Sequence, residues 1–231
     1  MIQTILLNGL PIMIAITFHE AAHGFVANRC GDPTAKHLGR LTLNPLAHID
    51  PVGTVLLPLF LMYSGLPIFG YAKPVPVNFG RLRSPRRDMV LVALAGPAMN
   101  MVLAFVGALM LTFSYARGYG GGMDGVIAGG ITGAMLTKTL TNFIFINIFL
   151  AVLNMLPIPP LDGGRVLVGL LPPPIAAYVS RIEPFGFIIV FGGLFLAPTL
   201  LSYLGIMIDP AKTILLGPTI KIMTYLLSGM I

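Results

Sequence analysis

The sequence predicts an all-α polytopic membrane protein with about five to six transmembrane helices and a re-entrant or β-hairpin insertion after the first helix. Of its 231 residues, 56% are hydrophobic and only 10% are charged, whereas soluble domains carry about 25% charged residues. Several apolar segments also approach the roughly 20 residues that a helix needs to cross the hydrocarbon. We therefore expect one membrane-embedded domain over residues 1–231 and a multi-pass location in the cell membrane.

The first hydrophobic segment covers residues 2–27. Residues 1–18 contain no Lys or Arg, so the basic region that begins a cleavable signal peptide is absent, and we expect this segment to be retained. A polar stretch follows to residue 50, and the glycine-rich stretch 118–130 predicts a flexible loop between helices. Further apolar segments cover about 89–116, 131–157, 185–207 and 211–230.

The weaker apolar segment 51–70 decides the predicted topology. Its flanks are basic, which places both in the cytoplasm under the positive-inside rule, and Pro58, Gly65 and Pro67 interrupt it. These features favour a re-entrant hairpin, which membranes tolerate where protein covers its backbone; a conventional six-span topology is the alternative. The segment "KPVPVNF" after it has the alternation of a short edge strand, where prolines are tolerated. A net charge of +6 could suggest a nucleic-acid partner, but in a membrane protein basic residues mark the cytoplasmic side, and no nucleic-acid partner is expected.

The sequence "HEAAH" at residues 19–23 carries the chemistry of the first helix. His19 and His23 are four residues apart, so a helix projects both imidazoles from one face. Two neutral imidazoles at that spacing bind Zn2+, and Glu20 between them serves as acid or base. Polar residues that only hold helices together are the alternative, but ionisable groups inside a membrane are functional by default.

A zinc site needs a third protein ligand, and Asp162 is the strongest candidate. It lies in "NMLPIPPLDGGR", where an apolar run breaks into prolines and glycines. If residues 51–70 are re-entrant, His19, His23 and Asp162 share one side of the membrane, which favours the hairpin. His48 and Asp50 are the runners-up, with a hydrogen-bonded interface loop as their simpler interpretation. The remaining polar candidates receive structural roles: His37 is a surface residue, Asp32 a turn residue and Asn100 an interhelical hydrogen-bonding residue, and Cys30 receives no function.

Three motifs together resemble the site-2 protease family of intramembrane zinc metalloproteases. They are "HEAAH" (19–23), "AGPAMN" (95–100) and "NMLPIPPLDGG" (154–164), in the family's order and in apolar segments. The resemblance covers about residues 10–170 and is closest to the compact bacterial-type branch without a PDZ domain. It implies a catalytic core at about 1–170 with additional C-terminal helices at about 175–231.

On the matching positions the resemblance implies one Zn2+ per chain held by His19, His23 and Asp162, with Glu20 as catalytic acid/base. It implies that Asn154 holds the substrate or its developing oxyanion; capping of the broken backbone near Pro157 is the alternative role. The implied substrate is a transmembrane protein or a signal-peptide-like segment, cut within or near the lipid bilayer by an active site near the cytoplasmic side. The competing function is a non-catalytic zinc-binding transporter or sensor, and the sequence indicates no oligomeric state.

Overall fold

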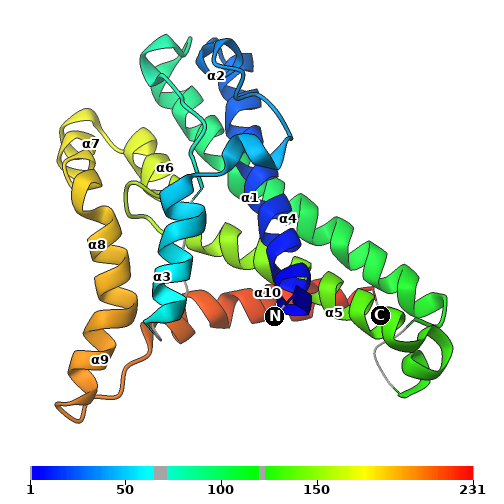
Figure 1. The fold of residues 1–231 in the computed structure, drawn as a ribbon. Coiled ribbons are helices and arrows are strands. Elements are labelled where there is room, and N and C mark those ends of the chain that lie inside the picture. Colours follow the sequence, from blue (N-terminus) through cyan, green and yellow to red (C-terminus); the bar gives the residue numbers. More distant parts are fainter. Residues whose placement is uncertain (1, 65–71, 120–122, 231) are drawn as a thin grey trace.

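Three long helices form the body of the molecule: α1 (Ile2–Arg29), α4 (Pro85–Ala116) and α5 (Met123–Asn154). The computed structural model describes residues 2–64, 72–119 and 123–230. Helix α4 packs against both α1 and α5 (Figure 1). Its first turn is favourable because Pro85 occupies the first helical position, where a missing N–H costs nothing, and the Asp88 carboxylate accepts the Ser84 amide at 2.8 Å.

Small side chains allow α4 and α5 to approach closely. A Cβ atom on Gly107 would lie 2.9 Å from a ring carbon of Phe143, so a larger residue there would require the Phe143 ring to move. Since lipid is as apolar as leucine, close packing of this kind holds membrane helices together. The buried cluster between the two helices consists of Ala104, Ala108, Leu111, Leu140, Ile144 and Ile148.

Short helical segments fill the connection between α1 and α4. Gly31, with a φ of +110°, ends α1 in a backbone conformation that favours glycine. The segments are α2 (Thr34–His37), η1 (Pro45–His48), η2 (Pro51–Leu56), α3 (Leu57–Tyr63) and η3 (Phe79–Arg81).

The chain after α5 makes a tight turn and continues as a series of shorter helices. Helix α7 packs on α6, and the run to α9 leads away from the three long helices, whereas α10 returns to pack against α5 (Figure 1). The segments are α6 (Asp162–Leu170), α7 (Pro173–Ser180), η4 (Glu183–Phe185), α8 (Gly186–Phe191), η5 (Gly192–Leu196), α9 (Ala197–Ser202), η6 (Ala211–Leu216) and α10 (Gly217–Ser228).

The described helices confirm an all-α multi-pass protein and leave the predicted number of spans unconfirmed. Among the described residues, four helical stretches are long and apolar enough to cross a membrane: Gly9–Arg29, Pro85–Ala116, Gly133–Asn154 and Pro173–Ser202. The last of these comprises the consecutive segments from α7 to α9. The apolar stretch Pro51–Leu61 is helical but shorter than a span. The expected span at 211–230 forms η6 and α10, and side chains of α10 join the cluster between α4 and α5. The division into a core at 1–170 and C-terminal helices stays a prediction.

The structure does not confirm two local predictions, the loop at 118–130 and the β-hairpin. The glycine-rich stretch 118–130, expected to be a loop, is helical from Met123 onward; glycine is common in membrane helices, and here apolar residues surround it. The β-hairpin is not confirmed: residues 72–78 form neither helix nor strand, and the described residues pair into no strand. Pro74 and Pro76 lack the N–H groups that a ladder needs. Residues 65–71, which the re-entrant prediction includes, lie outside the described residues.

Candidate metal centre

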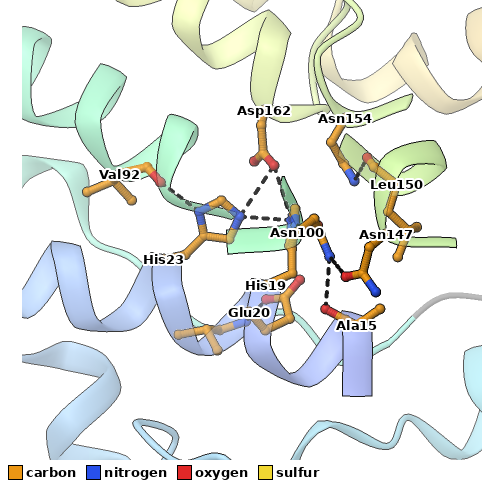
Figure 2. Close-up of polar contacts among 11 residues, drawn as sticks. Ala15, His19, Glu20, His23, Val92, Asn100, Asn147, Leu150, Asn154 and Asp162 are labelled. Atoms are coloured by element: carbon orange, nitrogen blue, oxygen red, sulfur yellow. Dashed lines mark hydrogen bonds and ion pairs between the residues drawn. The ribbon is translucent and has the colours of Figure 1, made fainter. Parts of the chain in front are cut away.

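Three buried side chains from distant parts of the sequence meet between α1, α4 and α6. His19 and His23 lie one turn apart on α1, and their Nε2 atoms are 3.0 Å apart. Oδ2 of Asp162, the first residue of α6, lies 3.2 Å from Nε2 of His19 and 3.3 Å from Nε2 of His23 (Figure 2). Within the described ranges, this is the one group of His, Cys, Asp or Glu side chains arranged to hold a metal ion.

Glycines allow these groups to come together. A Cβ atom on Gly96 of α4 would lie 2.6 Å from Nε2 of His19 and closer still to Nε2 of His23, so both imidazoles pack directly over the α4 backbone. Cβ atoms on Gly163 and Gly164 would overlap the backbone of residues 155–159. The turn after α5 therefore folds tightly over the start of α6 and holds Asp162 against α1.

The hydrogen-bond partner of Nδ1 determines which nitrogen of each imidazole carries the proton. Nδ1 of His23 lies 2.7 Å from the Val92 carbonyl oxygen, and Nδ1 of His19 lies 2.6 Å from Oδ1 of Asn100. Because both oxygens only accept, each Nδ1 must donate. Each neutral imidazole then directs its Nε2 lone pair toward the other and toward Asp162.

A metal cation fits this arrangement. Oδ2 of Asp162 is buried and receives no hydrogen bond from the described residues, so three electron-pair donors face one another. Zinc bonds of about 2.0 Å place tetrahedral ligand atoms about 3.3 Å apart, close to the three observed separations. A metal ligand must be deprotonated, and a cation bound among these three atoms would keep the Asp162 carboxylate ionised although it is buried.

Glu20 is held from the other side by an extended segment of the chain. Its Oε2 accepts the backbone amide of Val75 at 2.7 Å. The same segment is anchored at both ends, because the Lys73 amide donates to the His48 carbonyl at 2.9 Å and the Asn78 amide donates to Asp32 Oδ2 at 2.6 Å. Residues 73–78 therefore run past the histidines and fix one oxygen of Glu20.

A cavity of about 260 Å³ opens onto the three converging side chains. Asn154 contributes to its wall and donates Nδ2 to the Leu150 carbonyl of its own helix at 3.0 Å (Figure 2). Arg165 lies over the Phe79 ring and 3.7 Å from Glu183. The cavity is lined by His19, Glu20, His23, Pro74, Val75, Val77, Phe79, Val92, Ala93, Asn154, Pro160, Leu161, Asp162 and Arg165.

The other sequence candidates lie outside this group. His48 is buried and donates Nε2–H to the Thr42 carbonyl, and Asp50 accepts the amides of Val52 and Gly53 at the start of η2. Asp32 forms a buried turn, as expected, and also accepts the Asn78 amide. Asn100 joins helices, as predicted, through contacts to the Ala15 carbonyl of α1 and to Asn147 of α5.

Sequence reasoning missed Gly96, Val75 and Asn147. Gly96 lay inside a quoted motif, but nothing local shows that imidazoles pack on it. The partner of Val75 is 55 residues away. Asn147 had a readable signal, because a polar side chain in an apolar helix, seven residues before Asn154 and thus on the same face, is expected to have a role.

Comparisons with known proteins agree with the geometry. The profile of Peptidase family M50 matches residues 9–192. The chain is 42% identical over 189 residues to "Putative zinc metalloprotease YwhC" of Bacillus subtilis (strain 168), covering 82% of this chain and 80% of that protein. It is 33% identical over 189 residues to "Putative zinc metalloprotease Rip2" of Mycobacterium tuberculosis (strain ATCC 25618 / H37Rv), covering 81% of this chain and 66% of that protein. No solved structure matches the chain.

Proposed function

Because the chain belongs to peptidase family M50, the site-2 protease family of membrane zinc metalloproteases, we propose that it hydrolyses a peptide bond within or near a transmembrane segment of a membrane protein. The observation that carries the proposal is the convergence of His19, His23 and Asp162 within 3.3 Å beside Glu20 in one cavity. In this assignment the three converging residues are the zinc ligands and Glu20 is the general base.

The chemistry divides between the metal and the residues around it. Zinc, when bound, is a Lewis acid that polarises the scissile carbonyl and makes water more acidic. The Glu20 carboxylate takes a proton from the attacking water and passes it to the leaving amine as the C–N bond breaks. Oε1 is the atom available for this proton, since Oε2 already accepts the Val75 amide. The second amide hydrogen of Asn154 is the proposed donor to the substrate oxygen, because Leu150 takes the first.

The cavity also limits the form of the substrate. One wall is the extended segment around Val75, and the other contains Asp162 and Asn154. A peptide between them must expose its scissile carbonyl, which an intact helix keeps hydrogen-bonded to an amide four residues away. We therefore expect substrates with helix-weakening residues, such as glycine or proline, near the cut.

The active site belongs near the cytoplasmic side in this proposal. The start of α4 carries Arg86 and Arg87 and is preceded by Arg81 and Arg83, and Val92 of the same helix end contacts His23. Since basic residues mark the cytoplasmic flank of membrane helices, water would reach the site from there.

The test combines metal content with cleavage of a membrane-embedded substrate by the purified full chain. The parent should bind one zinc per chain and cleave. Glu20→Gln should keep the zinc and lose about 10²–10⁴-fold in rate, whereas Asp162→Ala should lose zinc as well. His37→Gln, an exposed histidine, is the control and should behave as the parent does.

Each outcome selects among the functions. Full cleavage by Glu20→Gln would remove Glu20 as the base, and zinc bound as tightly by Asp162→Ala would require another third ligand. Zinc binding with no cleavage of any membrane substrate would instead favour a non-catalytic transporter or sensor.

A further inference from the structure

Two buried asparagines lie behind His19, on the side away from the cavity (Figure 2). Asn100 of α4 and Asn147 of α5 are both 0% exposed. Buried amides are costly unless their polar atoms are hydrogen-bonded. The contacts of this pair, which we call the amide relay, therefore determine how each amide is oriented.

The contacts of Asn147 on α5 and of Asn100 on α4 determine the orientation of both amides. Nδ2 of Asn147 donates to the Phe143 carbonyl at 2.8 Å, so its Oδ1 faces Asn100. That oxygen accepts Nδ2 of Asn100 at 2.9 Å, and the same Nδ2 also donates to the Ala15 carbonyl at 3.2 Å. With both amide hydrogens used, Asn100 turns its Oδ1 toward Nδ1 of His19, at 2.6 Å.

The two histidines differ in how their protons are placed. The partner of His23 is the Val92 backbone carbonyl, which always accepts. The partner of His19 is a side-chain amide, which rotates by half a turn into a donor. A donor at that position would require the lone pair of His19 on Nδ1 and the proton on Nε2, and that proton would point at Asp162 and His23. A metal then loses one of its ligands.

We propose that Asn147 is a positioning residue that acts through Asn100 to hold His19 in its metal-binding tautomer. Asn147 is not part of the cavity wall, yet its Oδ1, at the shorter of the two Asn100 Nδ2 contacts, selects the orientation of the Asn100 amide together with the Ala15 carbonyl. Helix α5 thereby contributes to the metal affinity of two histidines on α1. The inference rests on His19 being a zinc ligand.

The first test is zinc affinity of the full chain, measured by competition with a chelator after metal removal. Asn147→Leu keeps the size of the side chain and removes one acceptor of Asn100, so zinc affinity should fall by up to about 10-fold, the lower end of the loss that is usual for direct partners of ligating histidines. Asn147→Asp keeps an acceptor for Asn100 and should bind zinc nearly as the parent does. Thr219→Val is the control, because Thr219 is equally buried and its hydroxyl donates to the Leu215 carbonyl, one turn earlier in the chain and outside the amide relay.

A double variant distinguishes an effect on the orientation of the Asn100 amide from an effect on helix packing. Asp at position 100 accepts with either oxygen, so the double variant Asn100→Asp with Asn147→Leu should regain zinc affinity over Asn147→Leu alone. If Asn147 only packs helices, the double variant will bind zinc no better than Asn147→Leu. That result, or parent-like affinity in Asn147→Leu, would overturn the proposal.

A second readout needs neither metal nor cleavage. With 15N-labelled histidine in the metal-free protein, NMR distinguishes the two imidazole tautomers. The parent should show His19 protonated on Nδ1, and Asn147→Leu should move the proton partly or wholly to Nε2; an unchanged tautomer overturns the relay even where the variant is too unstable for titration. A parent that binds zinc without cleaving would contradict the proposed protease and leave the relay intact. A parent that binds no zinc would refute the ligand assignment, while NMR still decides the tautomer.

Discussion

The backbone amide of Val75 donates to the carboxylate of Glu20 over 2.7 Å. This contact joins the proposed general base to a segment 55 residues further along the chain. Since Pro74 and Pro76 on either side have no N–H, Val75 supplies the one backbone donor between Lys73 and Val77. The proline alternation therefore aims a single donor at Glu20.

Replacing Val75 by proline removes that donor, together with a buried side chain. We expect Val75→Pro to keep one zinc per chain and to lose about 10²-fold in cleavage rate, the scale of a misplaced catalytic group. Val75→Ala retains the amide and controls for the lost side chain, which is buried. Equal loss in both variants would show that the side chain, and not the amide, matters.

Gly96 should tolerate no side chain. Gly96→Ala places a Cβ 2.6 Å from Nε2 of His19, and such overpacking costs about 1–3 kcal/mol. We expect weaker zinc binding and a lower thermal unfolding midpoint. Gly193→Ala is the matched control, because nothing lies within 4 Å of its Cβ position; zinc affinity in Gly96→Ala equal to that of this control would refute the packing argument.

Asn154 should act on the reaction and leave the metal alone. Asn154→Leu removes the proposed donor, and loss of one such donor typically costs about 10²–10³-fold in kcat. Zinc content should remain at the parent level in the same preparation. If the residue only caps its helix through the Leu150 carbonyl, the variant will lose thermal stability while kcat of the folded fraction stays unchanged.

Asp32 should make stability depend on pH. Burial alone would raise its pKa, but hydrogen bonds from Thr34 and Asn78 outweigh burial and lower it below the ordinary value. A lowered folded-state pKa means that its stabilisation is complete above the unfolded pKa, about 3.9, and is lost as pH falls through the folded value. Asp32→Asn should therefore be less stable at pH 7, by about 1.5–3 kcal/mol for a hydrogen bond to a charged group.

Unfolding midpoints at pH 7 and below pH 4 measure this difference. The gap between parent and Asp32→Asn should narrow as the pH falls below about 4 and close below the folded-state pKa of Asp32. Asp209→Asn changes the same charge at an exposed position and serves as control. A gap that is constant with pH would mean that the carboxylate charge contributes nothing.

The orientation in the membrane is testable with single cysteines. Cys30 is the one native cysteine, so Cys30→Ala provides a background for Arg83→Cys before α4 and Arg117→Cys after it. An impermeant maleimide should label position 83 only from the cytoplasmic side and position 117 only from outside. The reverse pattern would place the active site on the other side of the membrane.

Local sequence patterns were enough to predict most of the long helices and three of the site residues. Long apolar runs predicted the helices around α1, α4 and α5, because crossing lipid requires length and hydrophobicity. The loop predicted at 118–130 was too long, because α5 already begins at Met123 and glycine is common in the helices of membrane proteins. The edge strand at "KPVPVNF" was inferred from alternation, which cannot show whether a partner strand is present, and the β-hairpin was implied by the family resemblance. His19, Glu20 and His23 were readable because one helical turn places them together whatever surrounds them.

The sequence by itself determined that this is a helical membrane protein and that two histidines share one face of its first helix, since both properties depend only on neighbours in the chain. Only the tertiary structure decided what meets those histidines. The register between α1 and α4 brings Gly96 beneath the imidazoles and Asn100 behind His19, and the turn over Gly163 and Gly164 delivers Asp162. These contacts join segments tens of residues apart, and side-chain packing between helices, not local periodicity, sets such registers.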